Sequence, residues 1–442
     1  MTAWAAPARP AGRAAAHPWT AAEGLETGFY VLTLLLMSEA LLGPVFAPIE
    51  GQQPPAWLQL MWLPIYAVQT GWLALRAERL GRVWLGLLAS LVLVAFAFAS
   101  VSWSVAPDVS LRRSVALLFT SLLGCQIAAR YGWRGLVELF AATFLILAIG
   151  STISAVLVPS FGIDHKLHIG AWQGLWLEKN QLGAAMAKGA LACLSAAVLA
   201  PQRRLFWVLC TVLCAALVVL STSTTALLAL LLVLAGAVVL AGLRGGGLIT
   251  VATLWLVLLG GVVVGSVLLL APELLLQAAG KDATLTGRTG LWEALGRRIA
   301  ERPWQGYGYA AFWSDPQGPA FFVRRDVGWR APTAHNGWLE VLVQLGWVGL
   351  GLFTCHFLLS AIAAGRKLFS GGEGVWAVLS TALFVLFSLS ESTFMQQNNL
   401  NWVLYIATTA KLLESRRTSG AQPAGTGRTA AAASLRRTSA AP

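Results

Sequence analysis

Apolar residues gather in long runs along most of the chain. The runs are roughly 17–25 residues long, enough for a helix to cross the hydrocarbon core of a bilayer. Inside lipid each backbone polar group must be bonded within its own segment, so the runs predict helices. The pattern predicts about twelve transmembrane helices and therefore an all-α, polytopic integral membrane protein. The expected spans are residues 28–47, 57–75, 83–101, 114–129, 136–157, 181–199, 205–220, 224–243, 248–270, 336–364, 375–390 and 400–413.

The composition agrees with this class of protein. Of the 442 residues, 57% are hydrophobic and 11% are charged. A soluble domain usually carries about 25% charged residues, so a soluble globular fold is excluded. All five cysteines fall inside predicted helices, and we therefore expect no disulfide framework in the loops.

Basic residues mark alternate short loops. They are Arg76, Arg79 and Arg82; Arg130 and Arg134; Arg203 and Arg204; Arg244; and Arg366 with Lys367. By the positive-inside rule these loops lie in the cytoplasm, together with both termini. The longer loops then face the other side. The net charge of +12 is read as this topological signal and as attraction to the lipid bilayer, and no nucleic-acid partner is expected.

The chain divides into five parts along its length. A disordered cytoplasmic N-terminus is expected at 1–24, nine helices at 25–270, an extracytoplasmic loop at 271–335, three helices at 336–414 and a disordered basic tail at 415–442. The long loop exceeds the normal length of a connector, and such loops are usually functional.

The long loop contains one helical pattern. Residues 289–300 place Leu291, Trp292, Leu295 and Ile299 on one stripe, and Pro303 follows. We expect this helix to lie flat on the membrane surface. Aromatic residues come after this helix in the sequence. They are consistent with an interfacial aromatic belt or with faces on which sugar rings stack.

Four polar motifs fall at the outer ends of the predicted helices. They are Trp103-Ser104-x-x-Pro107 ahead of Arg113; Trp172-x-Gly174 with Lys179-Asn180-x-x-Gly183; Thr286-Gly287-Arg288-Thr289-x-x-Trp292; and His335-Asn336-Gly337-x-x-Glu340. If the protein has an active site, these motifs must meet in space.

Several of these cations suit a phosphate ligand. A guanidinium group matches phosphate oxygens with two parallel hydrogen bonds. Arg288 also begins a helix, where free backbone N–H groups favour an anion. Lys179, Arg324, Arg325 and Arg330 are further candidates. For each of them the alternative is a solvated charge or a side chain that reaches toward lipid head groups.

His335 is the candidate base. A histidine side chain titrates near neutral pH and accepts a proton from a hydroxyl group. The alternative is a histidine that caps a helix or binds carbohydrate. Glu340 lies one helical turn from Asn336 and is placed to orient a partner. His165 and His168 lack the carboxylate or cysteine ligands that would complete a metal site, so neither a metal nor a cofactor is expected.

Together the four motifs resemble the bacterial O-antigen ligase and polysaccharide polymerase superfamily, over residues 85–405. The resemblance implies a GT-C-like glycosyltransferase in the bacterial cytoplasmic (inner) membrane, with its active site facing the periplasm. It implies an undecaprenyl-pyrophosphate-linked oligosaccharide donor and a saccharide or lipid-linked acceptor, with a chain-length regulator and a flippase as candidate partners. It makes His335, Arg288 and Lys179 the candidate catalytic residues. The candidate substrate-binding residues are Asn336, Glu340, Arg330, Arg325, Arg324, Trp172, Asn180, Trp292 and Arg113.

The resemblance leaves alternatives open. The Trp103–Pro107 and Trp172–Gly183 motifs are most like the exopolysaccharide polymerase branch, whereas ligase-type members place an arginine near the position of Lys179. An O-antigen ligase that transfers a chain to lipid A-core is the nearest rival. A polysaccharide transporter or flippase would show two related halves, and we find no such repeat. A membrane subunit without activity would not need the outer motifs.

Overall fold

Helices make up nearly all of the regular structure. The computed structural model describes residues 21–46, 56–166, 168–270 and 288–415, and within them the extended pairing is one isolated bridge between Ile163 and Trp172. The α-helices are α1 (Ala21–Leu36), α2 (Leu42–Phe46), α3 (Trp62–Leu75), α4 (Trp84–Ala99), α5 (Pro107–Arg130), α6 (Trp133–Leu157), α7 (Pro159–Gly162), α8 (Lys179–Leu199), α9 (Arg204–Leu220), α10 (Thr224–Leu243), α11 (Gly247–Leu270), α13 (Arg288–Glu301), α14 (Pro319–Val327), α15 (Gly337–Arg366), α16 (Gly371–Ser388) and α17 (Leu400–Leu412).

Each of the twelve predicted spans contains a helix. Of the helical segments described, 7 are both long and apolar enough to cross a membrane. The all-α class and the polytopic membrane architecture are therefore confirmed. The count of twelve crossings stays a prediction. α1, α3 and α17 are short, α5 carries several charges, and α11 qualifies only as the shorter apolar segment Gly247–Gly261.

The first predicted span was wrong in its second half. It was expected over residues 28–47, but α1 ends at Leu36 and a turn follows before α2. Glu39 and Leu41 in this turn have φ angles of 62° and 65°, which no α-helix accommodates. The Leu41 N–H donates to the carbonyl of Leu175 at 2.8 Å instead of continuing the helix. Glu39 therefore lies in the turn and not in a helix.

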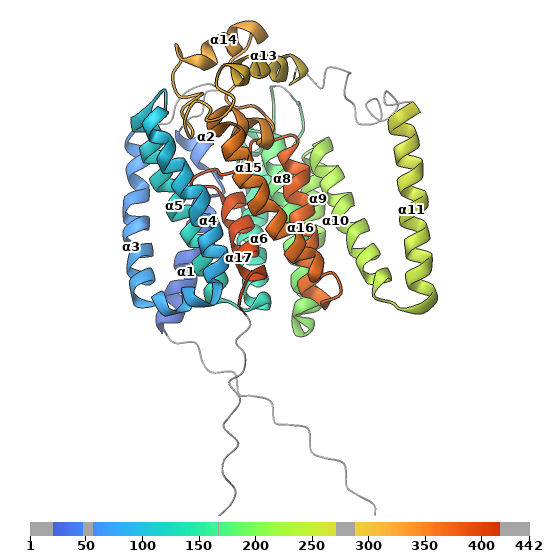
Figure 1. Ribbon diagram of the computed structural model, residues 1–442. Coiled ribbons are helices and arrows are strands. Elements are labelled where there is room, and N and C mark those ends of the chain that lie inside the picture. The colour runs from blue at the N-terminus through green and yellow to red at the C-terminus, as the bar shows by residue number, and fades with distance from the viewer. Residues whose placement is uncertain (1–20, 47–55, 167, 271–287, 416–442) are drawn as a thin grey trace, which may run out of the picture.

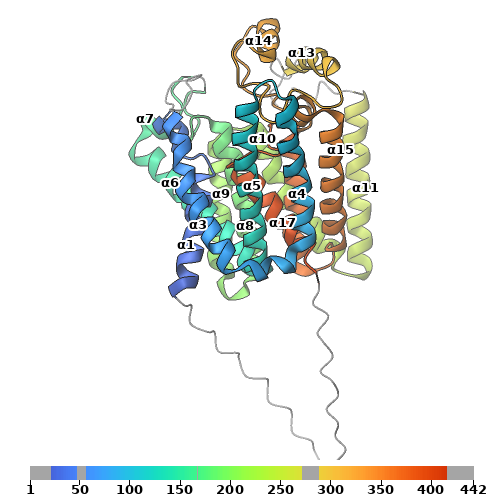
Figure 2. The ribbon, with the colours of Figure 1, turned by 60° about the vertical axis from the view of Figure 1, so that its left-hand side comes forward.

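The long helices form a bundle whose two ends differ (Figures 1 and 2). α8 and α17 run through its interior, and α11 stands at its edge, beside α10. The basic loops lie together at the end where α1 begins and α17 ends. Contacts join them: Arg79 and Arg130 both reach Glu26, and Arg244 donates to the carbonyl of Leu368. α13 and α14 cover the opposite end.

The helix α15 is kinked at Gly346, and the kink receives the loop that follows α13. Gly346 has a φ of 65°, and a Cβ there would lie 2.3 Å from the backbone of Trp304, so only glycine fits. Carbonyls freed by the kink accept from the loop, since Tyr307 and Gly308 donate to Val343 and Gln344 at 3.1 and 2.9 Å. The kink thus clamps residues 303–309 against the bundle by backbone hydrogen bonds.

The predicted surface helix exists, but its apolar stripe faces protein. α13 spans Arg288–Glu301, close to the expected residues 289–300. Leu291 and Leu295 are fully buried and pack with Phe312, Ala334 and Val343 in a second hydrophobic cluster. The expectation that this stripe rests on lipid was wrong, because the unpredicted helix α14 and the loop fold back over it. The cap, residues 288–335, is therefore a small packed unit.

Candidate functional site

Arg288 and His335 meet through a carboxylate that the sequence did not single out as a site residue. A terminal nitrogen of Arg288 lies 4.0 Å from one Glu391 oxygen, and His335 Nδ1 lies 3.8 Å from the other. The side chains of Arg288, His335 and Glu391 are 24%, 25% and 41% exposed, so all three line an accessible surface. Glu391 belongs to the turn between α16 and α17, far from the cap in sequence.

The backbone and the ring of His335 are both held in an unusual place. Its φ is 48°, and its N–H donates to Thr333 Oγ1 at 3.3 Å. The Trp329 ring centroid lies 6.0 Å away with a tilt of 36° between the planes. Nδ1 is buried without a hydrogen bond in the described structure, and a Glu391 oxygen lies 3.8 Å from it. Strained backbone of this kind is often found at functional sites.

Glu340 connects the two loop segments that carry His335 and Glu391. It is 5% exposed, and its carboxylate accepts four hydrogen bonds. Oε1 accepts from Trp313 Nε1 at 2.9 Å and Gln344 Nε2 at 2.5 Å. Oε2 accepts from the Ala334 N–H at 2.7 Å and Ser392 Oγ at 3.0 Å. Ala334 precedes His335 and Ser392 follows Glu391, so Glu340 fixes the positions of both segments.

Three other candidate residues also form hydrogen bonds within the protein that hold the site in place. Asn336 is the N-cap of α15 and accepts from the N–H groups of Trp338 and Leu339 at 2.9 and 3.1 Å. Trp292 Nε1 donates to the Ala334 carbonyl at 3.0 Å. Arg324 donates to the carbonyls of Ala331 and Trp313, both at 3.1 Å. Burial lowers the pKa of Arg324 below its usual value, which fits a guanidinium occupied by the protein itself.

The first motif fixes the cap to the start of α5. Ser104 and Ser110 share a hydrogen bond of 2.7 Å, and Ser110 donates to the Tyr309 carbonyl at 2.8 Å. Trp103 Nε1 donates to the Gln305 carbonyl at 3.0 Å. Arg113, one turn after Ser110, has an exposed side chain within electrostatic range of Tyr309 and Glu340. Arg113 is thus the remaining candidate cation on the bundle side of the site.

The second motif lies against a different loop. Lys179 begins α8, and its ammonium group donates to Thr222 Oγ1 at 3.2 Å and to the Thr222 carbonyl at 3.4 Å. Asn180 is exposed, whereas Trp172 is partly buried and its N–H donates to the Leu220 carbonyl. These contacts hold Lys179, Asn180 and Trp172 beside the turn between α9 and α10. The structure joins Arg288 with His335, and it gives Lys179 other partners.

Two cap arginines remain at the surface. Arg325 is 63% exposed, lies 3.6 Å from Asp326 and covers the Phe322 ring at 5.4 Å. Arg330 is exposed and follows Trp329, whose ring faces His335. Arg330 is therefore the closer of the two in sequence to the Trp329–His335 ring pair.

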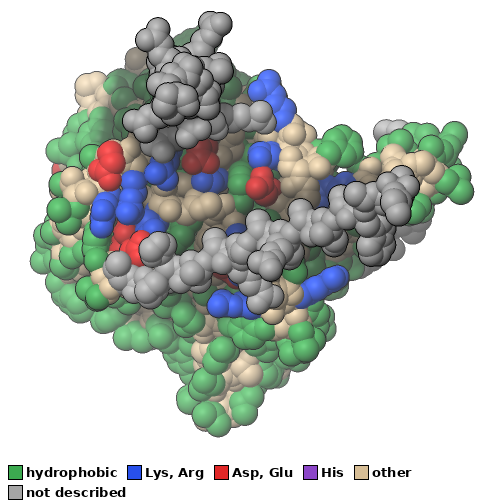
Figure 3. Space-filling model, turned by 90° about the horizontal axis from the view of Figure 1, so that it is seen from below, with side chains coloured by type: hydrophobic (Ala, Val, Ile, Leu, Met, Phe, Trp, Pro, Cys, Tyr) green, Lys and Arg blue, Asp and Glu red, His purple; other side chains and the backbone are tan. Residues whose placement is uncertain are grey.

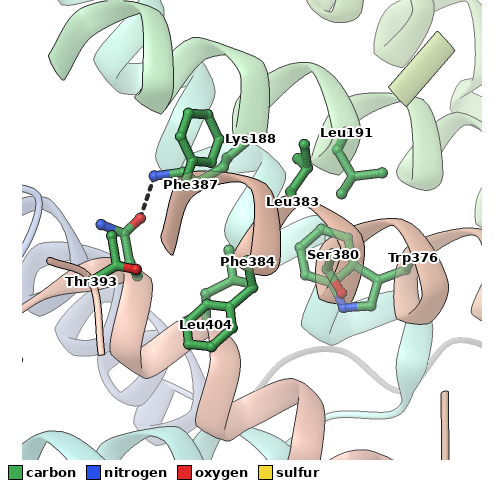
Figure 4. A pocket seen from close by; sticks show the side chains of 10 residues that line it. Lys188, Leu191, Trp376, Ser380, Leu383, Phe384, Phe387, Thr393 and Leu404 are labelled. Atoms are coloured by element: carbon green, nitrogen blue, oxygen red, sulfur yellow. Dashed lines mark hydrogen bonds between the residues drawn. The ribbon is translucent and has the colours of Figure 1, made fainter. Parts of the chain in front are cut away.

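A narrow cavity opens on the membrane side of Glu391 (Figure 4). Lys188 on α8 donates to Asn401 and covers the Phe387 ring at 4.7 Å. Glu391 follows Phe387 by one turn and acts electrostatically on Lys188. The Thr393 hydroxyl lines the same cavity without a hydrogen bond in the described residues. The volume of ≈ 20 Å³ leaves room for about one water molecule.

Among the described residues, no group of three or more His, Cys, Asp or Glu side chains is arranged to hold a metal ion. The site instead offers the cations of Arg288 and Arg113, the His335 ring and the Glu391 carboxylate around an accessible surface. Such an arrangement can bind an anion and move a proton beside it.

The comparison with protein families covers this region. Residues 209–354 match the family described as O-Antigen ligase. The predicted resemblance to this superfamily is confirmed. The matched segment runs from α9 into α15 and includes Arg288, His335 and Glu340, whereas Lys179 and Glu391 lie outside it.

A curated protein points to the same branch. The chain is 32% identical over 127 residues to the exopolysaccharide production protein ExoQ of Rhizobium meliloti (strain 1021). The match covers 26% of this chain and 28% of that protein. The chain thus aligns with less than a third of its relative. The family match supports the superfamily, and the match to ExoQ supports its exopolysaccharide branch.

Proposed function

We propose that the protein is a membrane glycosyltransferase that polymerises polyprenyl-pyrophosphate-linked repeat units of an exopolysaccharide. The observation that carries the proposal is the Arg288–Glu391–His335 cluster at the end of the bundle opposite the basic loops. By the positive-inside rule this end faces the periplasm of a bacterial inner membrane. The matches to the O-Antigen ligase family and to ExoQ support the reaction class.

The donor side of the reaction is assigned to Arg288. The leaving group in the proposed transfer is a lipid pyrophosphate, which needs its charge held and neutralised. Arg288 begins α13, so its guanidinium and the first N–H groups of the helix favour a phosphate at the same place. One of its terminal nitrogens faces Glu391, and the other terminal nitrogen and Nε remain for bidentate contact with phosphate oxygens.

The acceptor side is assigned to His335. With its Nδ1 directed at Glu391, the neutral ring keeps Nε2 free to accept the proton of an acceptor hydroxyl. The carboxylate of Glu391 then stabilises the imidazolium that forms. The distance of 3.8 Å is longer than a hydrogen bond, and such contacts often tighten when substrate binds. The oxygen of the acceptor forms the new glycosidic bond as the pyrophosphate leaves.

The test supplies purified protein with lipid-linked repeat units alone. We expect a ladder of longer lipid-linked products, lost in His335→Ala and strongly reduced in Glu391→Gln. His165→Ala is the matched control, because His165 is an exposed histidine of another loop. No ladder with lipid-linked units alone, but transfer after core lipopolysaccharide is added, would replace the polymerase by an O-antigen ligase.

A further inference from the structure

A crevice at the basic end of the bundle lies between α1, α3 and α5. Its lining includes Glu26, Tyr30, Trp72 and the three arginines Arg76, Arg79 and Arg130. Seen from below, this face of the protein gathers Lys and Arg side chains among a few acidic ones (Figure 3). The crevice is at the opposite end from the Arg288–Glu391–His335 cluster and takes no part in the proposed transfer.

Two of the three arginines already have carboxylate partners. Glu26 is 2% exposed and lies 3.3 Å from Arg79 and 3.0 Å from Arg130, while the Tyr30 hydroxyl donates to it at 3.0 Å. Arg130 also lies 3.7 Å from Glu23. Its 3.0 Å approach to Glu26 has the distance of a hydrogen bond but not the angle, so this contact is an ion pair.

Arg76 takes no part in these carboxylate contacts. It caps the C-terminus of α3, and its Nε is buried with no hydrogen-bond partner among the described residues. A buried donor without a partner is unfavourable, so an acceptor at this position is favoured. Since Arg79 and Arg130 have Glu26 and Glu23 opposite them, the crevice carries one excess positive charge at Arg76.

The surroundings of Arg76 are those of a lipid-facing surface. α3 stands on the rim of the bundle (Figures 1 and 2). Leu75, the residue before Arg76, is 69% exposed, and Leu63, more than three turns earlier on α3, is 59% exposed. Trp72 lines the crevice one turn from Arg76. A ligand here therefore meets a cation at the end of the helix and an apolar surface along it.

We propose that this crevice binds the phosphate of an anionic phospholipid, with Arg76 as its principal contact. Basic pockets between membrane helices are a recurring way to hold anionic head groups. The lipid chains lie along α3 beside Leu75, and the head group lies at the mouth of the crevice beside Arg76, because the crevice volume of ≈ 10 Å³ is too small to enclose it. The bound lipid thereby stabilises the position of α1, whose Glu26 is the carboxylate at the centre of the crevice.

The first experiment uses native mass spectrometry of the wild-type protein with phosphatidylglycerol and phosphatidylcholine of equal chain length. We expect one phosphatidylglycerol to be retained in preference to phosphatidylcholine. Absence of that preference would overturn the proposal without any variant having to fold. A separate arm of the experiment adds inorganic phosphate. If millimolar phosphate fully displaces the bound phosphatidylglycerol, the site is reassigned to free phosphate.

The second experiment measures thermal stability in detergent. Phosphatidylglycerol raises the Tm of the wild type, since a ligand of the folded state stabilises it. Arg76→Gln loses most of that shift and Arg76→Lys keeps part of it. Arg203→Ala is the matched control, because Arg203 belongs to another basic loop at the same end. An unchanged lipid shift in Arg76→Gln, or an equal loss in Arg203→Ala, would refute the assignment.

Discussion

Replacing Glu340 is the sharpest test of how the site is assembled. Its buried carboxylate accepts from Trp313, Gln344, Ala334 and Ser392. Glu340→Ala leaves four donors without an acceptor, and the two that are buried, from Ala334 and Ser392, cost about 1–3 kcal/mol each. Against a typical stability of about 5–15 kcal/mol this change threatens the fold itself.

Glu340→Gln is the more informative change because it keeps the shape. The amide retains one oxygen, which serves Trp313 and Gln344. Its NH₂ group then faces Ala334 and Ser392, and the serine hydroxyl can turn to accept from it. The Ala334 N–H cannot, so one buried donor is lost, at about 1–3 kcal/mol. The lost bond is the one that positions His335.

The assay compares the melting temperature with the kinetics of polymer formation. We expect Glu340→Gln to lower Tm by a few degrees and to lower kcat tenfold or more, with a small change in the donor KM. Glu293→Gln is the control, since Glu293 is 79% exposed on α13. A purely structural role would affect Tm alone. Wild-type kcat in Glu340→Gln at reduced Tm would refute the positioning role.

Four further predictions follow from the same geometry. Arg288→Lys keeps the charge but loses bidentate contact with phosphate, so product formation should fall at least tenfold at unchanged protein level. Near-normal product formation by Arg288→Ala would show that this residue is not part of the site. Purified enzyme should remain active in EDTA, and activity lost in EDTA but restored by magnesium or manganese would contradict metal independence. Cysteine at Gly318 should be labelled from outside intact cells and cysteine at Arg203 should not; the reverse pattern would invert the topology. A hydrogen bond from Arg297 holds the pKa of Asp326 below its usual range, so this contact stabilises the cap above about pH 4 and its contribution is lost as the pH falls below that value. Hydrogen-exchange protection of α13 and α14, corrected for the intrinsic exchange rate at each pH, measures this loss; equal protection at about pH 5 and about pH 3 would count against it.

The sequence predicted the helices well because their signal is local. Runs of apolar residues long enough to span a bilayer need no knowledge of distant contacts, and each predicted span holds a helix. The break after Leu36 was missed because residues 37–47 stay mostly apolar in sequence. What ends α1 is the hydrogen bond from Leu41 to Leu175, a partner more than a hundred residues away.

The candidate site was predicted in part. Arg288 and His335 do face a common carboxylate, but their partner Glu391 was not among the site residues predicted from the sequence. The signal that could have selected it is the position of this acidic residue at the outer end of a predicted helix. The sequence also could not separate contact residues from frame residues, since Glu340, Asn336 and Arg324 have the chemistry of ligands and are occupied by the protein.

The arrangement of α15 explains why so many of these residues bond to other parts of the protein and position the site. The first turns of this helix contribute the cap of Asn336 and the carboxylate of Glu340, and the kink at Gly346 fastens the loop that follows α13. A reaction at the membrane surface needs its base held at a fixed depth, and the cap alone is too small to supply that rigidity. By bonding Ala334 and Ser392 to one carboxylate on α15, the protein transfers the rigidity of the bundle to His335 and Glu391.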